Sequence, residues 1–260
     1  MAVYTAIDNP ALFHEAKKYT GNNNTNNITG MSFQPDWVWL KVRSAGSGQN
    51  HTLYDSVRGA TKFLESDTTN AEATGSNYLT AFNSDGFTLG NDQSHVNANS
   101  DTYMSWSWKS GTSFTNDASS TGVGTIDSSG STNQTAGFSI VSWTGTGSAG
   151  TVAHNLGSVP EWYIIKNRSD ANNWAVYHQK SNSNPEQYAL YLDGTSAATD
   201  DSGLANDTAP TNTVFSLTNG NYGNQNTYNY IGYFFAEKQG YSKFGKYVGL
   251  NSSNGHFVYL

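Results

Sequence analysis

The strongest constraint on the fold is an internal repeat, because a structure that suits one copy should suit the other as well. The stretch "FQPDWVWLKVRS" (33–44) recurs as "SVPEWYIIKNRS" (158–169). The identical positions are Pro35, Trp37, Lys41, Arg43 and Ser44 in the first copy and Pro160, Trp162, Lys166, Arg168 and Ser169 in the second. Downstream, "YMSWSW" (103–108) matches "YIGYFF" (230–235) in the same order. We therefore infer an internal duplication.

The two units also share an opening, in which a glycine follows an aromatic residue after one intervening position. "KKYTGN" (17–22) aligns with "VSWTGT" (141–146), and "GKYVGL" (245–250) aligns with both. The sequence thus predicts two full units and the first strands of a third, in residues 242–260. Strands that open one unit can complete the sheet of the unit before it. We therefore expect residues 242–260 to close the second unit and protect its edge.

The second opening contains a G-x-G-x-x-G pattern on Gly145, Gly147 and Gly150, which also occurs in dinucleotide-binding loops. Only the first of these glycines recurs in the other openings. The residues after Gly150 include Gly157 and Pro160 and do not start a helix. The pattern therefore predicts a turn between two strands and not a nucleotide site.

The composition favours strands throughout. Charged residues make up 13% of the chain, against about 25% in an average soluble domain. Asn, Ser, Thr and Gly supply the polarity, as in sheet proteins with many turns, and aromatic residues recur in strand-like runs. We predict an all-β fold of two homologous β-sandwich, jelly-roll-like units in tandem. The predicted parts are an N-terminal arm (1–12), a first unit (13–108), a Gly/Ser/Thr-rich linker (109–137), a second unit (138–241) and the partial third repeat (242–260).

The same composition excludes several function classes. Cysteine is absent, so no disulfide framework, thiolate metal site or catalytic thiol is expected. A net charge of −7 argues against nucleic acid as a partner. No apolar run reaches the roughly 18 residues of a membrane span, so membrane insertion is not expected. The N-terminus "MAVYTAIDNP" has no basic segment followed by an apolar run, so we expect no signal peptide.

The sequence offers no catalytic or metal-binding constellation. Its six histidines are scattered and show no metal-ligand spacing, so neither a metal nor another cofactor is expected. The carboxylates Asp55, Glu65 and Asp67 could form a glycosidase pair but have no distinctive context. Asp200-Asp201 and Asn116-Asp117 lack the alternating ligands of a calcium loop, so loop caps are favoured there. The sequence therefore predicts a protein that is not an enzyme.

Two patterns allow a binding interpretation beside a structural one. The repeated Lys-x-Arg pairs would form either a cationic patch for an acidic glycan or structural ion pairs, for which Asp36 and Glu161 are the candidate partners. We favour the ion pairs. The loop "LTNGNYGNQNTYNY" places Tyr222 and Tyr228 among Asn and Gly. Sugars stack on such rings, and Asn side chains hydrogen-bond their hydroxyls. Tyr222 and Tyr228 are therefore the candidate glycan-binding residues, with plain turn packing as the alternative.

Long blocks of the sequence resemble a known group of proteins. "PDWVWLKVRS…LYDSVRGATKFLESD…NSDGFTLG…YMSWSWK" is similar to a repeat domain of predicted tail-fibre and other structural proteins of marine tailed bacteriophages. "AGFSIVSWTGTGSAGTVAHNLGSVPEWYIIKNRS…WAVYH" and "APTNTVFSL…YIGYFFAEKQGYSKFGKYVG" resemble the companion unit of those proteins. Together the blocks run from about residue 10 to the end.

The resemblance implies a non-enzymatic virion structural protein, exposed on the particle surface and made in the host cytoplasm. Members are often much longer, so a tail fibre, a short spike and a capsid decoration protein are all expected roles. The implied partners are other virion proteins, further copies of this chain and a host-surface glycan during attachment. The alternative function is a carbohydrate-binding, lectin-like module.

Overall fold

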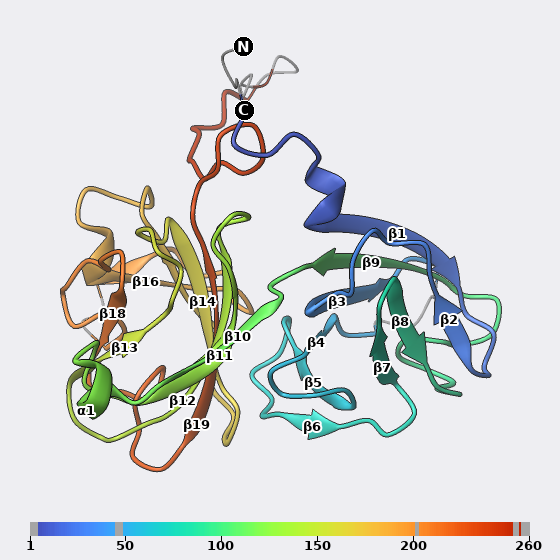
Figure 1. The fold of residues 1–260 in the computed structure, drawn as a ribbon, viewed down its shortest axis with the longest axis horizontal. Helices are drawn as coiled ribbons and strands as arrows, with labels where there is room; N and C mark the ends of the chain where they lie inside the picture. Colours follow the sequence, from blue (N-terminus) through green and yellow to red (C-terminus); the bar gives the residue numbers. More distant parts are fainter. Residues whose placement is uncertain (1–4, 45–48, 201–202, 252–254, 256–260) are drawn as a thin grey trace.

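The regular secondary structure of the protein is almost wholly antiparallel strands (Figure 1). The computed structural model describes residues 5–44, 49–200, 203–251 and 255. Helical structure in these residues is limited to η1 (Pro10–Leu12), α1 (Ala118–Thr121) and η2 (Pro185–Gln187). The predicted all-β class is therefore confirmed.

The first half of the protein, which we define as residues 14–108, contains a six-stranded and a three-stranded sheet. In sheet order, the large one is β1 (His14–Thr20), β9 (Thr102–Trp108), β3 (Trp37–Val42), β4 (Thr52–Asp55), β5 (Lys62–Glu65) and β6 (Ala73–Thr74). The small one is β2 (Asn26–Ile28), β8 (Gly86–Leu89) and β7 (Leu79–Asn83). Buried apolar residues from both sheets form one cluster, which is the core of this half.

The second half, which we define as residues 112–235, repeats the strand order of the large sheet and adds two strands at one edge of it. Its large sheet runs β10 (Thr112–Asn116), β11 (Ser128–Asn133), β12 (Phe138–Thr144), β19 (Asn229–Phe235), β14 (Trp162–Asn167), β15 (Ala175–His178), β16 (Tyr188–Tyr191) and β17 (Thr199–Asp200). Its small sheet pairs β13 (Gly150–Ala153) with β18 (Val214–Leu217). From β12 to β17 the order matches that from β1 to β6 strand for strand.

The large sheets are apolar on both faces because each face meets a different neighbour. In β3, Val38 and Leu40 point into the core of the first half, whereas Trp37 belongs to a third cluster. That cluster also contains Ile231 and Tyr233 of β19. The outer faces of the two large sheets therefore pack against each other, and the two halves lie side by side (Figure 1).

Gly21 and Gly145, the glycines near the start of the two halves, make the same close contact with a facing loop. A Cβ on Gly21 or Gly145 would lie 2.1 or 2.2 Å from a carbonyl oxygen of the facing loop. In that loop, Asn97 and Asn224 each accept a backbone N–H from the residue after the glycine, at 3.1 and 2.8 Å. Each amide nitrogen also donates to two carbonyl groups, one in its own loop and one in the loop of the glycine. Only glycine fits this approach, which explains why it recurs.

The stretch 109–137, predicted as a linker, differs from that expectation. It contains β10, α1 and β11, and β11 pairs with β12 along its whole length. Asp117 caps the short helix by accepting the Ser120 N–H. A strand made of Ser, Thr and Gly needs few apolar side chains when its backbone is paired on both sides. These residues therefore extend the large sheet of the second half.

The segment predicted to close the second unit does not do so in its described part. Among residues 242–251 and 255, Ser242 forms an isolated bridge with Lys238, and no residue belongs to a strand of either large sheet. Tyr247 is 74% exposed, whereas its counterparts Tyr19 and Trp143 are buried. The physical reason is that β1 and β12 pair with β9 and β19, the last strands of their own halves. An opening strand therefore completes its own sheet, not the preceding one.

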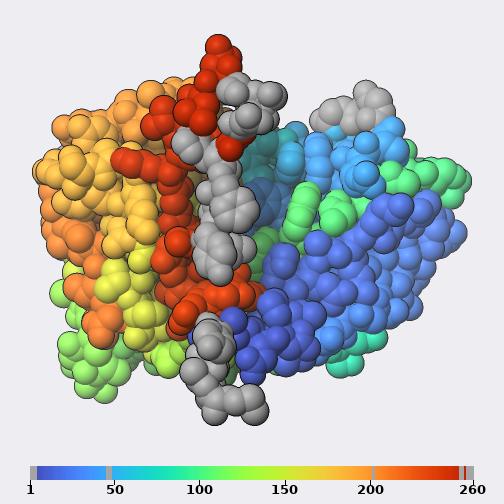
Figure 2. Space-filling view, turned by 90° about the horizontal axis from the view of Figure 1, so that it is seen from above, coloured from blue at the N-terminus to red at the C-terminus, as the bar shows by residue number. Residues whose placement is uncertain are grey.

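The arm predicted for residues 1–12 is described from residue 5 onward. The Ala6 N–H donates to the Gln239 carbonyl at 3.0 Å, and Ile7 is buried. This stretch therefore contacts the chain that follows β19. Viewed from above, the segment after β19 lies over the junction between the two halves, in red in Figure 2.

Candidate functional site

The junction between the two large sheets holds a cavity of about 270 Å³ lined mainly by aromatic rings, which we call the aromatic cavity. Its first wall is a row of three residues from adjacent strands of the first half. His14 of β1 pairs with Trp108 of β9, and Trp108 pairs with Trp37 of β3. Side chains that lie opposite each other in neighbouring strands share a face. The register therefore fixes this row.

The second wall is the corresponding row of the second half. Phe138 of β12 pairs with Phe235 of β19, and Phe235 pairs with Trp162 of β14. These strands occupy the same places in the sheet as β1, β9 and β3. The cavity thus lies between two equivalent rows that face each other.

Ring contacts hold the two rows together at one end of the cavity. Trp37 lies 5.7 Å from Phe138 and 5.9 Å from Phe235 between ring centroids. Trp108 lies 6.4 Å from Phe235 in an edge-on arrangement. Aromatic pairs at such separations attract each other beyond their buried area. The walls are therefore held by packing on rigid strands.

A third wall comes from the segment after β19. Tyr241, Ser242 and Phe244 line the cavity, and the Phe244 ring stacks on Trp162 at 6.1 Å. The Phe244 N–H donates to a carboxylate oxygen of Glu237 at 2.9 Å. This segment is thus anchored against the second half.

The cavity carries no formal charge near neutral pH. None of its lining residues is Asp, Glu, Lys or Arg. Burial lowers the pKa of His14, while Glu15 opposes that shift, so the His14 imidazole is neutral at pH 7. Two lining residues, Trp37 and Trp39, have buried indole N–H groups without a hydrogen-bond partner among the described residues. Both nitrogens are shielded from solvent and therefore from the cavity, so its polar lining comes from His14 and Ser242.

Tyr222 and Tyr228, the glycan-binding residues predicted from the sequence, lie away from this cavity. Both are half-buried and pack against the core of the second half. The Tyr222 hydroxyl accepts a hydrogen bond from Tyr191 at 2.9 Å, and the two rings are 5.4 Å apart. The structure does not bring Tyr222 and Tyr228 together with the residues of the aromatic cavity.

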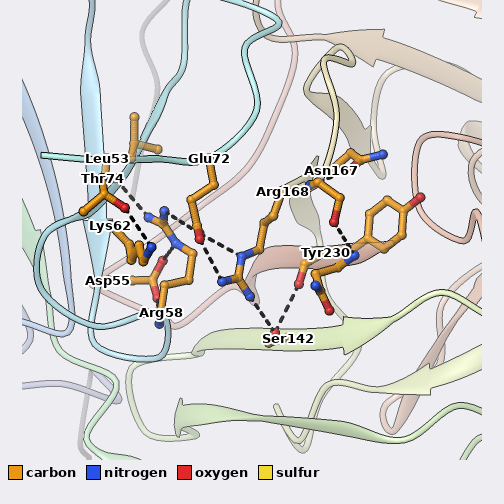
Figure 3. A network of polar contacts seen from close by, with 12 residues as sticks. Leu53, Asp55, Arg58, Lys62, Glu72, Thr74, Ser142, Asn167, Arg168 and Tyr230 are labelled. Carbon is orange, nitrogen blue, oxygen red and sulfur yellow. Dashed lines mark hydrogen bonds and ion pairs between the residues drawn. The ribbon is translucent and has the colours of Figure 1, made fainter. Parts of the chain in front are cut away.

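The Lys-x-Arg pair of the second half makes structural contacts, and Figure 3 shows those of Arg168. Burial lowers the pKa of Lys166 to about 8, and its ammonium donates to the Thr69 carbonyl at 2.8 Å. Arg168 forms a two-pronged ion pair with Glu72 at 2.8 and 3.0 Å, and Arg58 contacts the same carboxylate at 3.3 Å. Lys166 and Arg168 therefore bind the first half, although Glu72 was not among the ion-pair partners predicted from the sequence.

The carboxylates considered as a glycosidase pair each have a structural role. Asp55 is buried and binds Arg58. Glu65 accepts from the Asn70 amide at 2.9 Å, and Asp67 accepts the His51 N–H at 3.0 Å. Across the described residues, no group of three or more His, Asp or Glu could hold a metal ion. Of Asp200-Asp201, where the sequence favours a loop cap over a calcium site, residue 201 lies outside those residues.

These features define an all-β protein of antiparallel sheets with an aromatic cavity at the junction of its two halves. A family model described as a domain of unknown function, DUF7483, matches residues 9–260, and the chain belongs to that family. No curated protein and no solved structure gives a match. Within the described part of the chain, no helix is long and apolar enough to cross a membrane.

Proposed function

We propose that this protein is a non-enzymatic structural component of a tailed-bacteriophage particle, exposed on its surface in a tail fibre, a spike or a capsid decoration. In this proposal it consists of two homologous β-sandwich, jelly-roll-like units in tandem. The corresponding strand orders of the two halves support the duplication. The sequence resemblance supports the phage assignment, and other virion proteins and further copies of this chain are the proposed partners.

The observation that supports a structural role is the extensive contact between the two halves. The cluster between them contains Trp37, Leu53 and Leu64 of the first half with Ile164 and Trp174 of the second. Polar bonds cross the same junction, as the Glu72 contacts in Figure 3 show. A component that carries load or presents loops on a particle needs this rigidity.

Antibody-gold electron microscopy on purified particles from the source culture tests the proposal. Gold over heads, tails or fibres is expected, and antibody pre-absorbed with the purified protein should remove it. Label over the head would identify a decoration protein, and label on the tail would identify a fibre or spike component. Antigen found only in the lysate, with intact particles unlabelled, would refute the proposal.

A second candidate function is carbohydrate binding, which was the alternative suggested by the sequence. The aromatic cavity favours it, because ligand sites are typically concave, mostly apolar and equipped with a few polar groups. Host-surface glycans are the proposed partners in that case. This function is compatible with a place on the particle and is tested separately below.

A further inference from the structure

We propose that the aromatic cavity binds the ring of a neutral sugar, stacked on tryptophan. This inference rests on the second candidate function, carbohydrate binding, and does not depend on whether the protein belongs to a particle. The site differs from the loop of Tyr222 and Tyr228, which the sequence suggested.

The shape and lining of the cavity suit a single ring. Its volume of about 270 Å³ lies just below the range of roughly 300–1,000 Å³ that drug-sized ligands occupy. Trp39, Trp108 and Trp162 are half-buried, so each offers part of its ring to the cavity. The C–H face of a sugar is apolar and stacks on such surfaces, whereas a purely structural junction would close around its rings at native packing density.

One polar side chain beside the rings adds a second requirement for the ligand. His14 lines the cavity and is half-buried, with its ring 4.7 Å from that of Trp108 between centroids. A neutral imidazole has one N–H donor and one acceptor nitrogen, and sugar hydroxyl groups can pair with both. Ring faces beside an imidazole match the apolar face and polar edge of a sugar.

The charge of the cavity selects neutral sugars over acidic ones. The lining holds no Lys or Arg, and burial keeps His14 neutral at pH 7. A carboxylate in this site would lose its hydration without gaining a cation, which is costly. We therefore expect hexoses to bind and hexuronic acids to be excluded.

Titration with methyl glycosides tests the proposal on the full chain. The probes are the methyl glycosides of glucose, galactose and mannose, with methyl glucuronide as the acidic comparison. Tryptophan fluorescence and saturation-transfer NMR report binding. Because each probe has only about a dozen non-hydrogen atoms, a dissociation constant on the order of 1 mM is expected for at least one neutral glycoside. No saturable binding of any neutral probe would overturn the proposal together with the carbohydrate-binding function.

Paired variants locate the site. Trp108→Ala removes a ring from the cavity and should weaken binding about tenfold, and Trp108→Phe should retain part of it. The control is Trp106→Ala, because Trp106 is half-buried in the same strand but does not line the cavity. Thermal unfolding and near-UV circular dichroism check that each variant is folded.

The outcomes separate the cavity from other sugar sites. Binding that is lost in Trp108→Ala and kept in Trp106→Ala and Tyr222→Ala supports the proposal. Binding that survives in Trp108→Ala but is lost in Tyr222→Ala would overturn it and leave the carbohydrate-binding function intact. Equal loss in Trp106→Ala and Trp108→Ala would also overturn it, because the effect would not follow the cavity lining.

Discussion

Replacing Arg58 by methionine tests how the junction is held together. The Arg58 side chain is fully buried and binds Asp55, the Leu53 carbonyl at 2.9 Å and the Tyr233 hydroxyl at 3.3 Å. Arg58→Met keeps an unbranched apolar stem but removes the guanidinium, which leaves the Asp55 carboxylate buried without its cation. Breaking a buried pair in this way costs about 3–5 kcal/mol. We expect the free energy of unfolding to fall by that amount.

Urea and thermal unfolding, followed by tryptophan fluorescence and far-UV circular dichroism, measure this loss. For a chain of this size, the change corresponds to a lower melting temperature by roughly 6–20 °C. Tyr233 lies in the second half and also donates to Asp55 at 2.6 Å. Because the network crosses the junction, both probes should shift together in one transition.

A partly exposed ion pair at the surface provides the matched control. Lys17 and Glu15 lie 3.1 Å apart, with side chains 24% and 25% exposed. Breaking this pair by Glu15→Gln should cost no more than about 1 kcal/mol. Adding Asp55→Asn to Arg58→Met should recover part of the loss, because the unpaired charge disappears. The reasoning is refuted if Arg58→Met lowers the free energy of unfolding as little as Glu15→Gln does. It is also refuted if the variant unfolds in two separate transitions and only one of them is destabilised.

Three further predictions concern the second half. Gly145→Ala should lower the free energy of unfolding by about 1–3 kcal/mol, because the new Cβ would clash with a carbonyl oxygen. Gly249 occupies the same place in the third opening, and a Cβ there would have nothing within 4 Å, so Gly249→Ala should change this free energy by less than about 0.5 kcal/mol. Urea unfolding compares the two variants. Trp174→Phe loses the Nε1–H bond to the Glu65 carbonyl at 2.7 Å and should cost about 1–3 kcal/mol by the same assay. Burial lowers the pKa of His154 to about 4, below its unfolded value near 6.5, so its stabilising contribution is complete above pH 6.5 and falls by up to about 3 kcal/mol as the pH drops toward 4. His154→Gln should flatten this part of the pH profile, and an unchanged profile would contradict the assignment.

The repeat predicted much of the fold because it depends on residue order and not on packing. It aligned β3 with β14 and β9 with β19, and these pairs occupy equivalent places in the two large sheets. The repeat could not show which part of the protein packs against each face of a strand. In β9, Ser105 and Ser107 are fully buried, while Trp106 and Trp108 on the other face are only half-buried. Alternation of residue types identifies a strand but not its neighbours.

The added edge of the second half was missed for a related reason. β11 reads "SSGSTN" and has no apolar period, yet it pairs with β10 and β12 through its backbone. A Cβ on Gly130 would lie 1.9 Å from the Ile140 carbonyl oxygen. Glycine is therefore needed at this position so that β11 can approach β12 closely. Hydrophobic patterning cannot detect such a strand, and the Gly/Ser/Thr content suggested a linker instead.

The candidate site was missed because its residues belong to strands that, taken singly, resemble core. Trp108 and Trp162 become neighbours of one cavity only when the outer faces of the two large sheets meet. Because the strand orders of the two large sheets match, each sheet brings the equivalent row of positions to the junction. The two rows differ at two of their three positions, because His14 corresponds to Phe138 and Trp108 corresponds to Phe235. His14 is the one titratable residue in the two rows, so it gives the cavity a polar side and a direction in which a ligand can be oriented.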